Sequence, residues 1–224
     1  MPAKNRDLHG SAPDQADVAL LLIDVINDMD FPESDGLLRT AIPMAECVAE
    51  LRRRAKEAGV PVIYVNDNFG RWQSNFRAIV EHATRPESKG RRVAERLVPD
   101  EDDYFVLKPK HSGFFSTTLD VLLEYLGAET LILAGIAADI CVLFTANDAY
   151  IRDFHLIIPR DCVASNTEEA SRAALDQMAR VLKADTRASA ELTFPLRPDG
   201  RPEPDARAGR RWAASPSTEF APAG

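Results

Sequence analysis

Short, continuous apolar runs recur along this sequence and constrain its fold more than any other feature. Runs of this kind are typical of β-strands that are buried on both faces, as the strands of parallel sheets are. Helical periodicity occupies the segments between them, so strands alternate with helices. This alternation predicts a doubly wound, mostly parallel sheet in a three-layer α/β/α, Rossmann-like fold. The runs expected to form strands are Val18–Asp24, Val60–Asn66, Tyr104–Lys108, Thr130–Gly135 and Phe154–Pro159.

The expected helices have apolar residues three and four positions apart, which places them on one helical face. Gly59 is the expected stop of the first helix, because glycine adopts the left-handed conformation that often follows a helix. Ser165 and Glu168 have the spacing of a capping box. A further short strand is expected at Ala184–Ala190. The helices are expected at Ala41–Ala58, at Thr117–Leu126 after a capping Ser116, around Cys141, and over Ser165–Leu182.

The composition changes towards both ends of the chain. Residues 1–17 precede the first strand and form an expected N-terminal tail. Six of the fifteen prolines fall in the last 32 residues, so 193–224 is predicted to be a Pro-rich, mobile C-terminal tail. The sequence therefore indicates one domain over residues 18–192.

The charge and the cysteine content limit the partners and the compartment. A net charge of −8 and a pI near 5.1 argue against nucleic acid or an anionic membrane as a partner. No apolar stretch approaches the roughly 18 residues that a membrane span needs, and the first residues lack the apolar core of a signal peptide. Three cysteines, an odd number, favour a reduced, cytoplasmic setting.

Three reactive side chains fall at the carboxyl ends of predicted strands, where open parallel sheets bind their ligands. Asp24 ends the first strand, Lys108 ends the third, and Cys141 follows the fourth on the first turn of a helix. A helix N-terminus favours a thiolate. Taken alone, each has an ordinary alternative: a core cysteine, a turn-forming acid and a solvated lysine. Together they suit a nucleophile, a base and an electrostatic partner.

Three sequence blocks contain these residues: LLLIDVINDM, VLKPKHSGFFST and LILAGIAADICVLFTANDA. In this order and spacing they resemble the isochorismatase-like cysteine hydrolase superfamily, which includes nicotinamidases, N-carbamoylsarcosine amidohydrolases and ureide hydrolases. The resemblance covers about Val18 to Leu192. It implies a six-stranded sheet and an Asp24–Lys108–Cys141 triad. Strand periodicity alone leaves Lys110 as a competitor, but the family lysine precedes an S-x-F stretch by four residues, which selects Lys108.

The resemblance also implies a cis peptide bond at Ile136–Ala137 and an oxyanion hole formed by the backbone N–H groups of Ala137 and Cys141. In the implied mechanism, Asp24 takes the thiol proton and Lys108 stabilises the negative charge. The thiolate attacks an amide or ureide carbonyl, and water activated by the same carboxylate clears the thioester. Proteins of this superfamily generally form dimers or tetramers, so a homo-oligomer is expected.

The predicted function is metal-independent hydrolysis of a C–N bond in a small amide, carbamoyl or ureide substrate, without a cofactor. Metal-dependent nicotinamidases carry an Asp-x-His pair after the second strand, whereas this chain has Asn66, Asp67 and Asn68 there. Two alternatives remain open: an isochorismatase-type vinyl-ether hydrolase that does not need its cysteine, and a catalytically idle oligomeric α/β module.

The expected substrate-binding residues flank the predicted triad. Asn66 and Asn68 carry amides that could bind a carbonyl or carboxylate, and Trp72 and Phe114 could form an apolar wall. The alternative is that the aromatic residues of the 69–76 segment pack on the sheet or against a second subunit.

Overall fold

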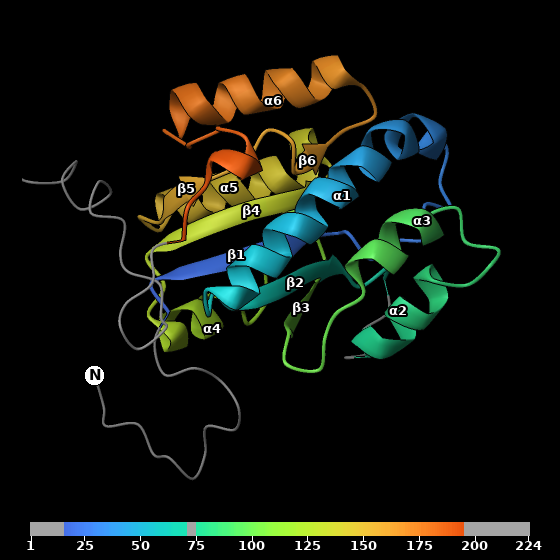
Figure 1. Ribbon diagram of the computed structural model, residues 1–224, viewed down its shortest axis with the longest axis horizontal. Helices are drawn as coiled ribbons and strands as arrows, with labels where there is room; N and C mark the ends of the chain where they lie inside the picture. Colours follow the sequence, from blue (N-terminus) through green and yellow to red (C-terminus); the bar gives the residue numbers. More distant parts are fainter. Residues whose placement is uncertain (1–15, 71–74, 195–224) are drawn as a thin grey trace, which may run out of the picture.

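A parallel sheet of six strands forms the centre of the computed structural model, which describes residues 16–70 and 75–194 (Figure 1). The five main strands lie in the order β3-β2-β1-β4-β5, and β6 pairs with the last residues of β4. The predicted fold class is confirmed, and all five predicted strands are present. Their bounds are β1 (Val18–Ile23), β2 (Val62–Asp67), β3 (Tyr104–Lys108), β4 (Thr130–Ile136), β5 (His155–Ile157) and β6 (Val163–Ala164).

The sixth strand was predicted in the wrong place. It is the two-residue segment β6, which is too short to leave a signal in the sequence. In the predicted segment 184–190, Asp185 makes an isolated bridge to Ile157 and no strand forms. Asp185 and Thr186 are half-buried and Arg187 is exposed, so this segment lacks the apolar run that a buried strand requires.

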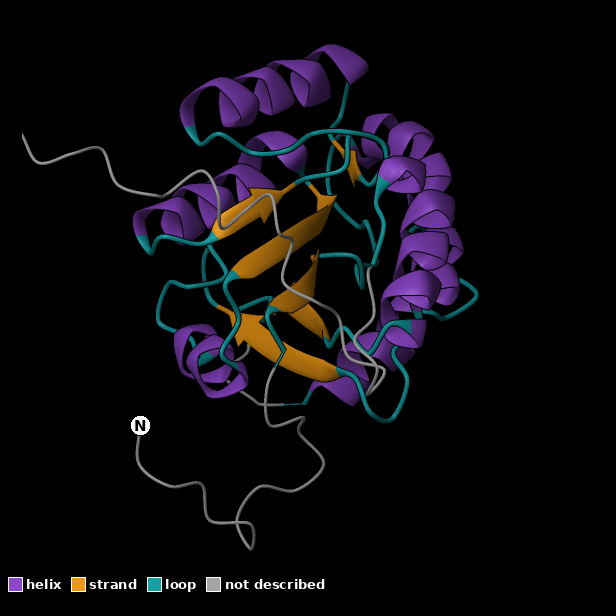
Figure 2. Cartoon of the chain, turned by 60° about the vertical axis from the view of Figure 1, so that its left-hand side comes forward, coloured by secondary structure: helices purple, strands orange, loops and turns teal. Residues whose placement is uncertain are grey.

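The helices cover both faces of the sheet (Figure 2). Alternating side chains of β1 supply the two cores: Leu20 and Leu22 pack with α1, while Leu21 and Ile23 pack with α4 and α5. Each fully buried leucine or isoleucine stabilises the fold by about 1.5–3 kcal/mol. The first layer contains α1 (Ser34–Glu57), α2 (Phe76–Ala83) and α3 (Arg91–Ala94), and the second contains α4 (Leu119–Leu126), α5 (Leu143–Ile151) and α6 (Glu168–Val181).

Three helix starts differ from the sequence prediction. Helix α1 begins at Ser34 and continues through Pro43, a residue that sequence patterns associate with a helix start. Helix α4 begins after Thr118 rather than Ser116. Helix α6 is capped by the side chain of Thr167, which accepts a hydrogen bond from the N–H of Ala170.

A glycine lies where β1 and β4 pair just before Asp24. Gly135 has a φ of 120°, and a Cβ atom there would lie 2.1 Å from the carbonyl oxygen of Ile23. A side chain at this position would therefore force the two strands apart. The glycine fixes how closely the ends of β1 and β4 meet.

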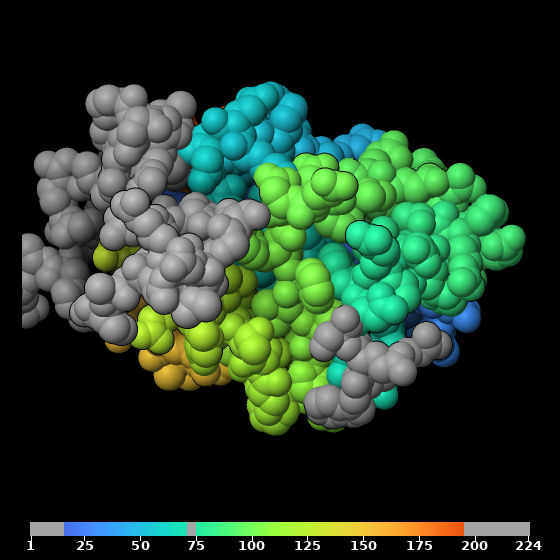
Figure 3. All heavy atoms as spheres, turned by 90° about the horizontal axis from the view of Figure 1, so that it is seen from below, coloured from blue at the N-terminus to red at the C-terminus, as the bar shows by residue number. Residues whose placement is uncertain are grey.

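The connections between β2 and β4 lie together on one side of the molecule. In the space-filling view these residues, drawn in green to yellow-green, make up much of the visible face (Figure 3). Among the described residues, no helix combines the length and the apolar character that crossing a membrane would require.

Candidate active site

Three strands and a turn bring the predicted triad together at the carboxyl edge of the sheet. Asp24 directly follows β1, and Lys108 is the last residue of β3. Cys141 lies in a single π-helical turn, Ala138–Val142, that follows β4. The chain proceeds from β1 outward to β2 and β3, and from β4 in the other direction to β5. The triad therefore lies at the point where the strand order reverses, the usual ligand site of such sheets.

The Lys108 ammonium group lies between the other two members of the triad. Its Nζ is 2.8 Å from Oδ2 of Asp24 and 3.6 Å from Sγ of Cys141. The side chain of Lys108 is fully buried and that of Asp24 is 8% exposed. Two buried charges of opposite sign stabilise each other, and separating them leaves an uncompensated charge in the interior.

Burial and the neighbouring charges together shift the pKa values of all three groups. It raises the pKa of Asp24, although the nearby Lys108 charge opposes the increase. Burial and then the Asp24 charge raise the pKa of the Cys141 thiol to about 12. Burial disfavours the charged form of Lys108, but the Asp24 and Cys141 charges outweigh it and raise its pKa. These shifts favour the ammonium form of Lys108 and the thiol form of Cys141, which is the form from which Asp24 takes a proton in the implied mechanism.

A second carboxylate, not predicted as a site residue, lies at the end of β2. The N–H of Asp67 donates to Oδ1 of Asp24 at 2.7 Å, and its Oδ2 is 3.8 Å from Nζ of Lys108. Asp67 is paired in register with Lys108 across β2 and β3. The signal in the sequence was the place of Asp67 directly after the predicted strand Val60–Asn66, because the carboxyl ends of parallel strands lie at the same edge of the sheet.

An imidazole near the nucleophile was also missed. Nδ1 of His111 is 4.0 Å from Sγ of Cys141, and its ring packs against that of Phe144 with centroids 5.4 Å apart. His111 is exposed, whereas Asp24 and Lys108 are buried. It follows Lys108 by three residues, so its place in the same loop was the signal that could have identified it.

Two hydrogen bonds fix the His111 loop to the helix that follows Cys141. The Ser112 hydroxyl donates to the carboxylate of Asp148. The N–H of Gly113 donates to Oγ1 of Thr145 at 3.0 Å, and the same hydroxyl donates to the carbonyl of Cys141 at 2.7 Å. The loop and the nucleophile are therefore held in a fixed relation by one threonine.

The turn that carries Cys141 is also held from its other side. A cis peptide bond joins Ile136 to Ala137, at the position that the family resemblance implies. Ser165 donates to Oδ1 of Asp139 at 2.6 Å and accepts a hydrogen bond from the N–H of Asp139. Ser165 therefore fixes this turn rather than capping α6, as its spacing from Glu168 had suggested.

Among the described residues, the side chains of Asn66 and Phe114 are used away from the triad. The fully buried Asn66 exchanges hydrogen bonds with the backbone of Ile26, so both ends of its amide are occupied. Phe114 lies in the core between the sheet and α4, with its ring near Phe154. The assignments of Asn66 and Phe114 are therefore wrong, because core packing and backbone satisfaction use these side chains. Trp72 lies outside the described residues.

Asn68 faces a separate small cavity. It lines a space of about 140 Å³ between the β1–α1 loop and α2, together with Asp28 and His82. Its Oδ1 accepts a hydrogen bond from the N–H of Gly70 at 2.9 Å. Phe76 packs on Tyr64 and Phe105. This agrees, for Phe76, with the alternative that the aromatic residues of the 69–76 segment pack on the sheet.

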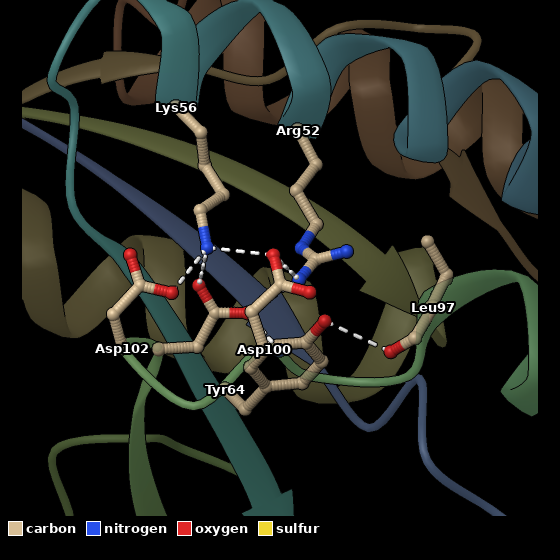
Figure 4. Close-up of polar contacts among 7 residues, drawn as sticks. Arg52, Lys56, Tyr64, Leu97, Asp100 and Asp102 are labelled. Carbon is tan, nitrogen blue, oxygen red and sulfur yellow. Dashed lines mark hydrogen bonds and ion pairs between the residues drawn. The ribbon is translucent and has the colours of Figure 1, made fainter.

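The donors near the triad that the structure describes do not suit a divalent metal ion. Asp67 lies beside the Lys108 ammonium group, and its neighbours Asn66 and Asn68 carry amides where an Asp-x-His pair would be needed. Elsewhere in residues 16–70 and 75–194, Asp100, Asp102 and Asp103 form one acidic group. The ammonium group of Lys56 donates to all three at 2.7–2.9 Å and already supplies their positive charge (Figure 4).

Comparison with protein families and curated proteins identifies the relatives of this chain. Residues 18–189 match the Isochorismatase domain. YaaI of Bacillus subtilis, an uncharacterized isochorismatase family protein, is 40% identical over 171 residues, which cover 76% of this chain and 93% of YaaI. The ureidoacrylate amidohydrolase RutB of Enterobacter sp. (strain 638) is 31% identical over 142 residues, 54% of this chain and 62% of RutB.

Solved structures agree with this assignment of the fold. N-carbamoylsarcosine amidase from Thermoplasma acidophilum is 29% identical with a TM-score of 0.60, and the match covers 78% of this chain and 98% of that chain. Nicotinamidase PncA from Bacillus subtilis is 25% identical with a TM-score of 0.59, over 76% of this chain and 99% of that chain.

Proposed function

Because this chain belongs to the isochorismatase family of hydrolases, we propose that it is a metal-independent cysteine hydrolase. Its substrate is a small amide, carbamoyl compound or ureide, and Cys141 attacks the carbonyl carbon of the C–N bond to form a thioester. The observation that carries this proposal is the position of Nζ of Lys108, 2.8 Å from Asp24 and 3.6 Å from the sulfur of Cys141.

The resting protonation states suit a nucleophile that is activated only when substrate binds. The thiol is protonated because burial raises the pKa of Cys141 to about 12. Asp24 hydrogen-bonds the thiol and takes its proton during attack, while the charged Lys108 stabilises the sulfur anion as it forms. Asp24 then gives the proton to the departing nitrogen. Each proton transfer stays within one buried group of three side chains.

Charge develops on the carbonyl oxygen as the C–S bond forms. We assign its stabilisation to the backbone N–H groups of Ala137, which precedes the π-helical turn, and of Cys141, which lies within it. Each such donor lowers a barrier by about 3–4 kcal/mol in related acyl-transfer sites.

The proposal is tested by removing the thiol and by removing metals. Ammonia release is measured over a panel of amides, carbamoyl compounds and ureides, with Cys141→Ala and Cys47→Ala compared. The reactive substrate should lose at least about 10⁴-fold in turnover for Cys141→Ala and little for Cys47→Ala, because only Cys141 lies in the triad. EDTA should leave the wild-type rate unchanged.

Two results would contradict the proposal. An alanine variant that keeps its turnover would exclude the thioester route, and vinyl-ether cleavage by that variant would favour the isochorismatase-type alternative. Activity that EDTA abolishes and Zn²⁺ restores would contradict the metal-independent chemistry.

A further inference from the structure

In the described part of the chain, one exposed titratable side chain contacts Cys141. It is the imidazole of His111. Its Nδ1 lies 4.0 Å from Sγ, within reach of a hydrogen bond to sulfur. The two other partners of the sulfur, Asp24 and Lys108, lie on its buried side. The imidazole is therefore the solvent-exposed partner of the sulfur.

The imidazole is held in place, as a catalytic group must be. Its ring packs against Phe144, which belongs to the helix that follows Cys141. The next two residues of its loop are anchored to that helix by the bonds of Ser112 to Asp148 and of Gly113 to Thr145. The imidazole and the sulfur thus share one rigid support, and their separation does not depend on a free loop.

Asp24 is the more enclosed of the two groups beside the sulfur that can take a proton from water. Its Oδ1 accepts a hydrogen bond from the Asp67 N–H, its Oδ2 lies 2.8 Å from Lys108, and its side chain is 8% exposed. The carboxylate exchanges a proton with the thiol in the first half of the reaction. The exposed imidazole of His111 is a second base beside the sulfur.

We infer that His111 is the base that activates water in the second half of the reaction. The inference rests on the proposed cysteine route and adds a catalytic residue to it. The neutral imidazole takes a proton from water as the oxygen attacks the thioester carbon. The C–S bond then breaks, and the sulfur receives a proton from the imidazolium 4.0 Å away. The products are the carboxylic or carbamic acid, the free thiol and the neutral imidazole, so protons and charge balance.

The test uses p-nitrophenyl acetate, because its leaving group needs no proton and acetylation can be separated from deacetylation. In His111→Ala, a burst of p-nitrophenolate near one equivalent should persist, and the later steady rate should fall by about 10²-fold or more. Intact-protein and peptide mass spectrometry should find the acetyl group accumulated on Cys141. His111→Gln, which keeps a polar side chain but cannot take the proton, should behave in the same way.

Two controls separate proton transfer from packing. His155→Ala removes an exposed imidazole at the start of β5, near the opposite edge of the sheet, and should leave both phases unchanged. Added imidazole should speed deacetylation of the isolated acetyl-enzyme of His111→Ala more than that of wild type. A residue that only supports the loop would give no such rescue.

The outcomes distinguish this inference from the proposed function. Deacetylation of both His111 variants within about threefold of the wild-type rate would overturn the inference and leave the cysteine route intact. A burst that slows in proportion to the steady rate would also overturn it, because His111 would then act before the thioester forms. If Cys141 is not acetylated even in wild type, the proposed route itself fails, and this inference fails with it.

Discussion

The two lysine–aspartate clusters, one at each edge of the sheet, hold their charges in different ways. At the amino edge, Lys56 donates to Asp100, Asp102 and Asp103 at 2.7, 2.7 and 2.9 Å, so its three N–H bonds all have short partners (Figure 4). At the carboxyl edge, Lys108 makes one short contact at 2.8 Å and two longer ones at 3.6 and 3.8 Å. The Lys108 ammonium group can therefore stabilise further negative charge that develops near it during a reaction.

The pKa shifts of the acids run in opposite directions. The hydrogen bond from Lys56 lowers the pKa of Asp100 and of Asp102, which lie near the surface. Burial raises the pKa of Asp24 despite its lysine partner. A lowered pKa fixes an acid in its ionised form, whereas a raised pKa brings it closer to conditions in which it can exchange a proton. Only the carboxyl-edge cluster is suited to proton transfer.

The largest expected effect comes from changing the acid of the carboxyl-edge cluster. Asp24→Asn should lower turnover by about 10²- to 10⁴-fold, because the base for the thiol is lost. The same change should make Cys141 easier to alkylate, since the Asp24 charge is one of the causes that raise its thiol pKa. Iodoacetamide labelling from pH 7 to 10, resolved by peptide mass spectrometry, measures this directly.

Lys108→Met should change the alkylation of Cys141 in the direction opposite to Asp24→Asn. The lysine lowers the thiol pKa, so labelling of Cys141 should slow while turnover also falls. If the two variants shift labelling in the same direction, the sulfur does not respond to the charges of this cluster, and the assigned roles are wrong.

The second largest effect is on stability, and it compares the two lysines. Lys108→Met should cost about 3–5 kcal/mol at pH 7, because a buried carboxylate loses its partner. Lys56→Met should cost about 1 kcal/mol or less, because Asp100 and Asp102 are exposed to water and the buried Asp103 keeps its ion pair with Arg52. Urea unfolding at pH 7 measures both. Equal losses would contradict the distinction between the clusters.

The Lys108→Met loss should also depend on pH. Removing the lysine raises the Asp24 pKa further, so the folded state retains the proton more tightly than the unfolded chain, whose ordinary value is 3.8. The destabilisation should therefore be small near pH 4, where Asp24 is protonated, and grow as the pH rises towards the folded pKa. A loss that is constant from pH 4 to 8 would indicate that lost packing, rather than charge, is responsible.

The same contrast explains what could be predicted from the sequence. The strand ends that carry Asp24 and Lys108 were predictable, because continuous apolar runs mark buried strands. His111 and Asp67 were missed because their roles depend on the register of β2 with β3 and on a loop anchored by Thr145. Asn66 was misassigned because a sequence pattern cannot reveal that the backbone of Ile26 already occupies its amide.

The smallest effect is expected at the amino edge, where the three acids share one ammonium group. Asp102→Asn should cost about 0.5 kcal/mol or less at pH 7, since Asp102 is 72% exposed and Lys56 keeps two carboxylate partners. Because the pKa of Asp102 is lowered in the folded state, its contribution exists above the unfolded value of 3.8 and is lost as the pH falls through the folded pKa.

The difference between Asp102→Asn and wild type should therefore disappear in unfolding measurements at about pH 2 and be largest at pH 6–7. A loss above about 2 kcal/mol at pH 7 would show that the cluster depends on each of its charges. The amino-edge cluster would then resemble the Asp24–Lys108 pair in its contribution to stability. Only the direction of the carboxyl pKa shifts would still distinguish the carboxyl-edge cluster from the amino-edge cluster.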